Sequence, residues 1–249
     1  VLCTKIFGTR YQDPNNGGLT RLNLMRGVED SLTRLQTDHI DLYLLHSFDT
    51  GTPLEETLGA LDDMVRTGKV RYIGCSNFRA WKIVEALWQS DRRNLARFVC
   101  IQNQYNLLNR WEIEPDLMPL CHEHGLGIMT YSPLAIGLLT GQFRRGQAPP
   151  PGNHPWSQEE GRGFSAHKYD FTIAMTERVD QIVQTLIEIG TRHNRTPTQV
   201  AIAWILDHPE ITAPILGADQ PEHVDEAFAA LDWHLPPEER RVLDEVSAV

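Results

Sequence analysis

The sequence lacks the features of a disulfide-stapled or membrane-spanning protein. Only four cysteines occur among its 249 residues, and no two of them form a C-x-x-C pair. Cys3, Cys75, Cys100 and Cys121 lie in apolar runs or in a predicted helix, as reduced, buried thiols do. No apolar run approaches the roughly 20 residues of a membrane span, and no basic segment followed by an apolar one opens the chain. We therefore expect a cytoplasmic protein, in a reducing compartment, with no membrane partner.

Positive charge is also scarce. The formal net charge is −10, and adjacent basic residues occur only as short pairs such as Arg144-Arg145. This balance argues against a nucleic-acid partner. Hydrophobic residues make up 41% of the chain, which is ordinary for a globular protein and excludes disorder throughout.

What is present is a regular alternation of apolar runs and amphipathic stretches. Apolar runs predict strands over residues 1–7, 41–49, 70–77, 98–106, 127–134 and 211–217. Apolar residues at steps of three and four predict helices over 19–36, 53–66, 81–89, 115–124, 178–194, 196–208, 221–231 and 237–246. Thr52-Pro53 is interpreted as a helix start in which the Thr52 hydroxyl caps the helix. Connections this long predict parallel strands and an α/β fold.

Periodicity alone leaves two parallel architectures open, a doubly wound sheet and a closed barrel. No G-x-G-x-x-G follows any predicted strand, and polar residues stand at nearly every strand end. A barrel gathers such residues at one mouth, so this distribution favours a barrel formed as one domain over residues 1–249. Residues 141–176 interrupt the alternation with prolines and glycines, and we expect them to form a poorly ordered lid over the site.

The strand ends supply one set of polar residues: Lys5, His46 with Asp49, Ser76-Asn77, Gln102, Tyr131-Ser132 and Gly217. Each has a structural explanation when taken singly, such as a solvated charge, a helix cap or a satisfied buried amide. Six in succession on one predicted face indicate a site. Amide side chains with an aromatic face suit a nicotinamide ring, and Lys5 and His46 would then lie near a reacting carbonyl.

At these residues the sequence resembles the aldo-keto reductase family. The segments that carry the resemblance are Thr4-Lys5, 32–46 (LTRLQTDHIDLYLLH), 68–78 (GKVRYIGCSNF), Gln102, 105–108 (YNLL), 130–141 (TYSPLAIGLLTG), 196–204 (TPTQVAIAW), 215–218 (ILGA) and Pro221-Glu222. The resemblance implies a (β/α)8 TIM barrel and an NADP-dependent alcohol dehydrogenase type of enzyme that reduces aldehydes or ketones. About six of the eight βα units are present.

The resemblance also implies roles for individual residues. Lys5 and His46 match the catalytic Lys and His. Residues matching carboxamide-binding and ring-stacking positions are Ser76, Asn77, Gln102 and Tyr131. Those bordering the pyrophosphate and the adenosine are Ser132, Leu134, Gly137, Leu138, Thr140, Gly217, Ala218, His223 and Glu226. No metal is implied.

Three departures from the family pattern bear on activity. The family's general acid Tyr and its Asp partner precede the strand that carries the Lys, and this chain opens at that strand. Because Val1 is not Met, we expect further sequence upstream. Tyr11 lies in the wrong loop to replace that Tyr. His223 and Ala227 stand where Arg or Gln and Asn are common, which leaves NADP and NAD both open as cofactors. We expect this 249-residue fragment alone to be impaired.

Two other readings remain. The same fold resembles the non-enzymatic β-subunits of potassium channels, which bind a nicotinamide cofactor and can dispense with the Tyr and Asp. A doubly wound dinucleotide protein of another family is disfavoured by the missing glycine fingerprint. The carbonyl substrate and the oligomeric state stay open, because substrate-facing residues in barrels come from variable loops.

Overall fold

A computed structural model of the chain describes residues 1–8, 17–150, 154, 156 and 170–248. These residues form two compact units. Unit 1 comprises residues 1–103 and 114–129, and unit 2 comprises residues 104–113 and 130–249. The predicted single barrel domain stays a prediction, and each unit is described by itself.

Unit 1 is built on parallel strands in consecutive order. β1 (Cys3–Ile6), β2 (Ile40–Leu45), β3 (Val70–Ser76) and β4 (Phe98–Gln104) are neighbours in that sequence, followed by β5 (Gly127–Tyr131), whose first residues belong to this unit. The pairs β1–β2, β2–β3 and β3–β4 are all parallel. This arrangement confirms the predicted α/β class. The strands follow one another in the sheet in their sequence order, as in a barrel, whereas the strand order of a doubly wound sheet reverses direction.

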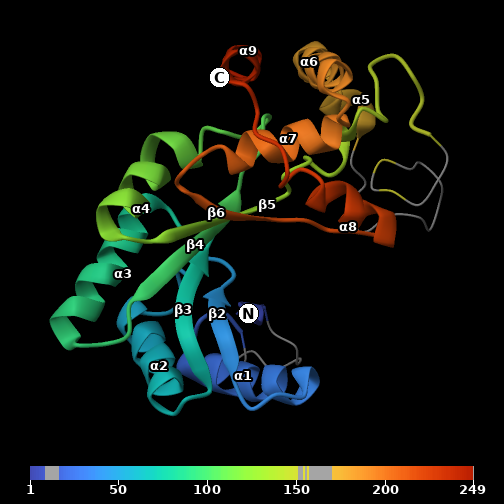
Figure 1. Cartoon of the computed structure of the whole chain (residues 1–249). Coiled ribbons are helices and arrows are strands. Elements are labelled where there is room, and N and C mark those ends of the chain that lie inside the picture. The colour runs from blue at the N-terminus through green and yellow to red at the C-terminus, as the bar shows by residue number, and fades with distance from the viewer. Residues whose placement is uncertain (9–16, 151–153, 155, 157–169, 249) are drawn as a thin grey trace. The chain divides into compact units, whose positions relative to one another are not determined.

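Helices cover the strands of unit 1 (Figure 1). They are α1 (Arg21–Leu35), α2 (Leu54–Arg66), α3 (Ala80–Arg93) and α4 (Met118–His124), the last preceded by a π-helical turn at Ile113–Leu117. The strand β2 is buried from Leu42 to Leu45, as its continuous apolar run predicts. The helix α3 extends four residues beyond its predicted end, to a left-handed cap at Asn94.

The start of α2 differs from the prediction. Pro53 occupies the N-cap position, and no side chain caps this helix. The Thr52 hydroxyl instead donates to Asp49 Oδ2 at 2.6 Å, so its interpretation as a capping group is wrong. The reason is local: the carboxylate three residues earlier in the same loop is the stronger, charged acceptor.

Unit 2 is mainly helical around β6 (Ile211–Ile215). Its helices are α5 (Phe171–Ala174), α6 (Glu177–His193), α7 (Pro197–Leu206), α8 (Pro221–Phe228) and α9 (Pro237–Val246), with a 3-10 turn at Leu138–Thr140. The predicted start of α7 is confirmed as a capping box between Thr196 and Gln199. α7 is buried almost throughout, since Val200 to Ile205 are all at most 1% exposed.

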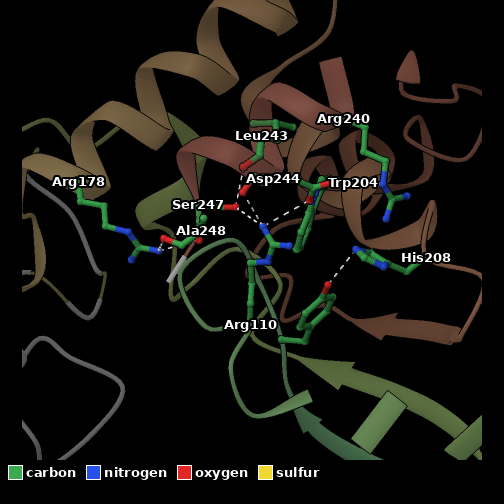
Figure 2. A network of polar contacts seen from close by, with 10 residues as sticks. Arg110, Arg178, Trp204, His208, Arg240, Leu243, Asp244, Ser247 and Ala248 are labelled. Atoms are coloured by element: carbon green, nitrogen blue, oxygen red, sulfur yellow. Dashed lines mark hydrogen bonds and ion pairs between the residues drawn. The ribbon is translucent and has the colours of Figure 1, made fainter. Parts of the chain in front are cut away.

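A polar network fixes the C-terminal helix α9 within unit 2 (Figure 2). Arg110 donates to the Asp244 carbonyl at 3.0 Å and to Ser247 Oγ at 2.8 Å. The Trp204 indole N–H donates to Asp244 Oδ1 at 2.9 Å. The Arg110 guanidinium also lies over the Trp204 ring, 5.3 Å from its centroid. The segment after β4 and the helix α7 are therefore both tied to α9.

Two further predictions are tested in part. All four cysteines are free, and Cys75, Cys100 and Cys121 are buried, but Cys3 is exposed. Burial raises the pKa of the Cys121 thiol to about 12. Seventeen of the 36 residues of the predicted lid, 151–153, 155 and 157–169, lie outside the described residues, as does Tyr11. Its described flanks contribute three buried aromatic side chains, Phe143, Trp156 and Phe171.

Among the residues described, none of the helices is both long and apolar enough to span a bilayer.

Candidate active site

The ends of β1 and β2 bring two basic side chains together. Lys5 pairs in register with Leu44, and the His46 N–H donates to the Ile6 carbonyl at 2.9 Å, so both side chains stand at the carboxyl ends of adjacent strands. Burial lowers the pKa of Lys5, which is partly buried. Burial also lowers the pKa of His46, and the charge of Lys5 lowers it further. A neutral imidazole beside an ammonium can donate one hydrogen bond to a carbonyl oxygen.

The end of β3 is connected to its two neighbouring strands through Ser76 and Asn77. The Ser76 hydroxyl donates to the Gln102 carbonyl at 2.7 Å, across to β4. Asn77 Nδ2 donates to the His46 carbonyl at 3.0 Å, across to β2, and to Ser76 Oγ at 3.2 Å. Asn77 adopts a left-handed backbone with φ 59°, which Asn tolerates better than most residues. Four of the predicted site residues thus form one hydrogen-bonded group.

Gln102 carries an unsatisfied acceptor in this group. The residue is 1% exposed, and its Oε1 has no hydrogen-bond partner among the described residues. A buried amide oxygen without a donor is costly, and it is expected where a ligand supplies the donor. A carboxamide N–H₂ is such a donor. The chemistry of the donors and acceptors at this site therefore fits a nicotinamide carboxamide.

Asp49 organises the loop that follows His46. Its carboxylate accepts hydrogen bonds from the Leu19 N–H at 2.8 Å, the Gly51 N–H at 2.8 Å and the Thr52 hydroxyl at 2.6 Å. Burial raises the pKa of Asp49, but these hydrogen bonds more than offset that effect and hold the pKa below its ordinary value. A side chain at Gly18, which has φ 65°, would fall on Asp49 Oδ2.

The sequence prediction noted Asp49 at the strand end but gave it no role. Its partner Leu19 lies 30 residues away, in the loop that precedes α1. Asn23 continues the connection, because its Nδ2 donates to the carbonyls of Gly18 at 2.7 Å and Phe7 at 3.4 Å. The loops after β1 and β2, which flank Lys5 and His46, are therefore fixed to each other.

Unit 2 contains the remaining predicted residues, beginning with Tyr131 at the end of β5. Tyr131 is partly exposed, and burial followed by the charge of Glu112 raises its pKa. The Tyr131 carbonyl accepts from the Tyr105 N–H at 3.3 Å, and the Ser132 carbonyl accepts from Asn106 Nδ2 at 2.8 Å. These contacts hold the end of β5 in place.

The loop after β5 has an unusual backbone. Ser132, Ala135, Ile136 and Gly137 all have positive φ, and Ile136 at 58° is a conformation that β-branched residues rarely adopt. Such strain is found where function requires it. Successive left-handed residues can turn neighbouring N–H groups towards an anion.

Much of this loop is already hydrogen-bonded internally. The N–H groups of residues 135 and 137–140 donate to loop carbonyls, and the Thr140 hydroxyl donates to the Gly137 carbonyl at 2.8 Å. Leu134 and Leu138 face apolar neighbours: Leu138 is buried, and Leu134 packs on Ile202 and Ala227. Thr140 and Leu138 therefore shape the loop.

The predicted adenosine-binding residues lie after β6 and on α8. Gly217 and Ala218 are exposed, and a side chain at Gly217 would meet no atom within 4 Å. His223 Nδ1 accepts from the Asp219 N–H at 3.3 Å, and the Glu226 carbonyl accepts from Gln199 Nε2 at 3.2 Å. Leu216 and Leu134 pack in one apolar cluster with Ala227. Unit 2 thus brings its two predicted cofactor segments together.

In the described part of the chain, no group of three or more His, Cys, Asp or Glu side chains could hold a metal ion.

Comparison with known proteins finds one family and several relatives. The model of the Aldo/keto reductase family matches residues 1–248. "Uncharacterized oxidoreductase YrpG" of Bacillus subtilis (strain 168) is 34% identical over 99% of this chain and 71% of its own length. "Probable voltage-gated potassium channel subunit beta" of Arabidopsis thaliana is 33% identical over all of this chain and 73% of its own length. "Versiconal hemiacetal acetate reductase" of Aspergillus parasiticus is 32% identical over 93% of this chain and 64% of its own length.

Proposed function

Because the chain belongs to the aldo/keto reductase family of oxidoreductases, we propose that it transfers a hydride between a nicotinamide cofactor and a small aldehyde or ketone. NADP is the proposed cofactor, with NAD as the second choice. The observation that carries the proposal is the buried Gln102 amide with its unsatisfied Oε1, placed beside Ser76 and Asn77 at the ends of β3 and β4.

The four site residues of unit 1 have distinct roles in this proposal. Gln102 accepts from the carboxamide and fixes the ring that, when bound, supplies the hydride. Asn77 fixes the His46 carbonyl, and so orients the strand end that carries the imidazole. His46 donates a hydrogen bond from its imidazole to the substrate carbonyl, and the alkoxide that hydride transfer forms takes its proton from solvent water. Lys5 supplies positive charge near the oxygen on which negative charge develops.

The residues of unit 2 hold the rest of the cofactor in this proposal. Tyr131 stacks on the nicotinamide ring, since its phenol is partly exposed at a strand end. Ser132 and the strained backbone at Ile136 face the pyrophosphate. Gly217, Ala218, His223 and Glu226 border the adenosine. The imidazole of His223 lacks the bidentate fork with which an Arg guanidinium binds a phosphate, so His223 favours NADP over NAD less than an Arg would.

The first test is cofactor binding, which requires no turnover. Quenching of intrinsic fluorescence by NADPH and by NADH gives the two dissociation constants for the complete protein. Gln102→Leu should weaken NADPH binding about 5- to 150-fold, as expected for a buried hydrogen bond worth roughly 1–3 kcal/mol. Gln89→Leu is the control, because it removes another buried amide oxygen without a partner, on α3. Equal affinities for all three proteins would refute the assignment of Gln102.

A second candidate function is a regulatory subunit that binds the cofactor without turnover. Relatives named as potassium channel β-subunits support it. Oxidation of NADPH by a panel of aldehydes and ketones separates the two. An enzyme should lose about 10²- to 10⁴-fold in kcat with His46→Gln. A regulatory subunit should bind NADPH tightly but should not oxidise it when a carbonyl compound is added. His46→Gln would then have no activity to lower.

We further infer a reducing compartment, the cytoplasm, as the site of action. The four free cysteines support it, because Cys3 is exposed and would be open to oxidation elsewhere.

A further inference from the structure

The outer face of α3 exposes two tryptophans. The helix buries Ile83, Ala86 and Leu87 on one side. On the other side Trp81, Val84 and Trp88 are 60%, 42% and 55% exposed. A spacing of three and four residues places these three side chains in one stripe. Exposed apolar side chains gathered in one place are a feature of binding faces.

A groove of about 840 Å³ runs beside this stripe, between α3 and the loop after β2. Trp81, Trp88 and Phe48 supply its aromatic surface, and Arg79, Lys82, Arg92 and Arg93 supply its positive charge. The volume is within the usual range for ligand-binding pockets. Tryptophan and arginine are also the residues most enriched at the energetic centres of protein interfaces.

The aromatic rings of the groove are held in place by cations. The Lys82 ammonium lies 4.6 Å from the Phe48 ring centroid and 4.2 Å from that of Trp81. The Arg92 guanidinium lies 4.7 Å from the Trp88 centroid. Each contact is worth roughly 0.5–1 kcal/mol at an exposed site. The rings are therefore pre-organised, which lowers the entropy lost when a partner binds.

The charges of the groove do not balance. Glu85 pairs with Lys82 at 2.9 Å, Glu55 pairs with Arg93, and Asp49 is occupied by its three donors. Among the described residues, neither Arg79 nor Arg92 has an acidic partner. In a chain of net charge −10, this surface is a local excess of positive charge.

We propose that the groove between α3 and the β2–α2 loop is a docking site for an acidic segment of a partner protein that carries aromatic side chains. Carboxylates of the segment pair with Arg79 and Arg92, and its aromatic rings pack against Trp81 and Trp88. A second α3 would bring the same excess of cations and is disfavoured. Two unpaired arginines are also too few for a nucleic acid, whose binding rests on many phosphate contacts. The proposal does not depend on the proposed reductase activity.

The test uses a probe of the proposed chemistry, a fluorescein-labelled copolymer of glutamate and tyrosine, with polyglutamate for comparison. Fluorescence anisotropy at low and high salt reports binding to the complete protein. Because the chain itself is acidic, general attraction cannot produce binding of a polyanion. We expect the copolymer to bind more tightly than polyglutamate, and salt to weaken binding.

Two pairs of substitutions separate the apolar from the charged contribution. Trp81→Ala with Trp88→Ala, and Arg79→Glu with Arg92→Glu, should each weaken copolymer binding at least tenfold. The control pair, Arg34→Glu with Leu35→Ala on α1, removes one exposed cation and one exposed apolar side chain and should change binding less than twofold. All six side chains are exposed, so thermal melting should show that each variant folds.

Two results would overturn the proposal. One is that the copolymer does not bind, or binds both groove variants as it binds the parent. The other is that sedimentation shows self-association that the tryptophan variant abolishes, which would assign the groove to a second copy of the chain.

Discussion

Asp49 connects two loops that the chain separates by 30 residues, and single side chains of this kind decide the geometry of the candidate site. Its three donors come from the loop before α1 and from its own loop. Asn77 has a comparable part, since it joins the ends of β2 and β3. Both residues form ordinary hydrogen bonds. They shape the site because their partners lie in different loops or strand ends.

Asp49→Asn should lower the free energy of unfolding by about 1–3 kcal/mol, because the new N–H₂ group faces donors that it cannot satisfy. Urea denaturation at pH 7 measures the difference. Asp63→Asn is the control, since its carboxylate makes an exposed ion pair with Arg21 and should cost about 0–1 kcal/mol.

The parent and Asp49→Asn should also differ in how their free energy of unfolding depends on pH. The folded-state pKa of Asp49 lies below its ordinary value of 3.8. Its contribution to stability is therefore complete above that value and is lost as the pH falls through the folded-state pKa. The difference between the parent and Asp49→Asn should shrink below about pH 4. A difference that stays constant down to pH 2 would contradict the assignment of the charged form.

Lys5→Met should raise the pKa of His46. Burial is the larger cause of the lowered value and remains in the variant, but the charge of Lys5 is removed. Titration of the imidazole C–H resonances by NMR measures the change. Lys82→Met, which removes a cation on α3, should leave the His46 titration unchanged; an equal shift in both variants would rule out the direct interaction.

At the scale of elements, the packing of β3 against β4 depends on a glycine. A side-chain carbon at Gly74 would lie 2.5 Å from the Cys100 carbonyl oxygen and 2.7 Å from Leu44 Cδ2. The register between β3 and β4 also shifts at this residue. The close approach of the two strands requires that no side chain be present.

Gly74→Ala should therefore destabilise the protein by about 1–3 kcal/mol, as overpacking of a core does. Gly59→Ala on α2 is a matched control, because its added carbon meets nothing within 4 Å and should stabilise the helix by roughly 0.5–1 kcal/mol. Chemical denaturation of both variants gives the two values, and opposite signs are expected.

The attachment of α9 depends on Arg110 (Figure 2). Arg110→Ala should cost about 1.5–3 kcal/mol locally, since hydrogen bonds from a charged donor are lost. Amide hydrogen exchange in α9 should accelerate about 10- to 100-fold. Arg241→Ala removes a cation that is 76% exposed on α9 itself and should leave exchange unchanged.

At the scale of the whole molecule, cofactor binding should stabilise the fold by mass action. A ligand at 100 times its dissociation constant adds about 2.7 kcal/mol to the free energy of unfolding. NADPH should thus raise the melting temperature of the complete protein, and the rise should be smaller for Gln102→Leu at the same concentration. An equal rise in both proteins would place the bound cofactor away from Gln102.

The sequence by itself determined the order and type of the elements, except the short helix α5, which lies in the segment predicted as a lid. The period of apolar residues decides between strand and helix locally, so five of the six strands lie wholly within their predicted ranges. Ile40, one residue before its predicted strand, begins β2. The strand-end residues Lys5, His46, Ser76 and Gln102 were also found this way, because the end of an apolar run marks the end of a strand.

Only the tertiary structure decided which groups pair. The Asp49 carboxylate accepts from the Leu19 N–H, 30 residues away in the chain. Cys3 is exposed although it lies in an apolar run. The groove beside α3 combines Phe48 with Trp81 and Trp88, which lie more than 30 residues further along the chain. Periodicity acts over a few residues, whereas these partners are set by strand register and loop path, which local sequence does not encode.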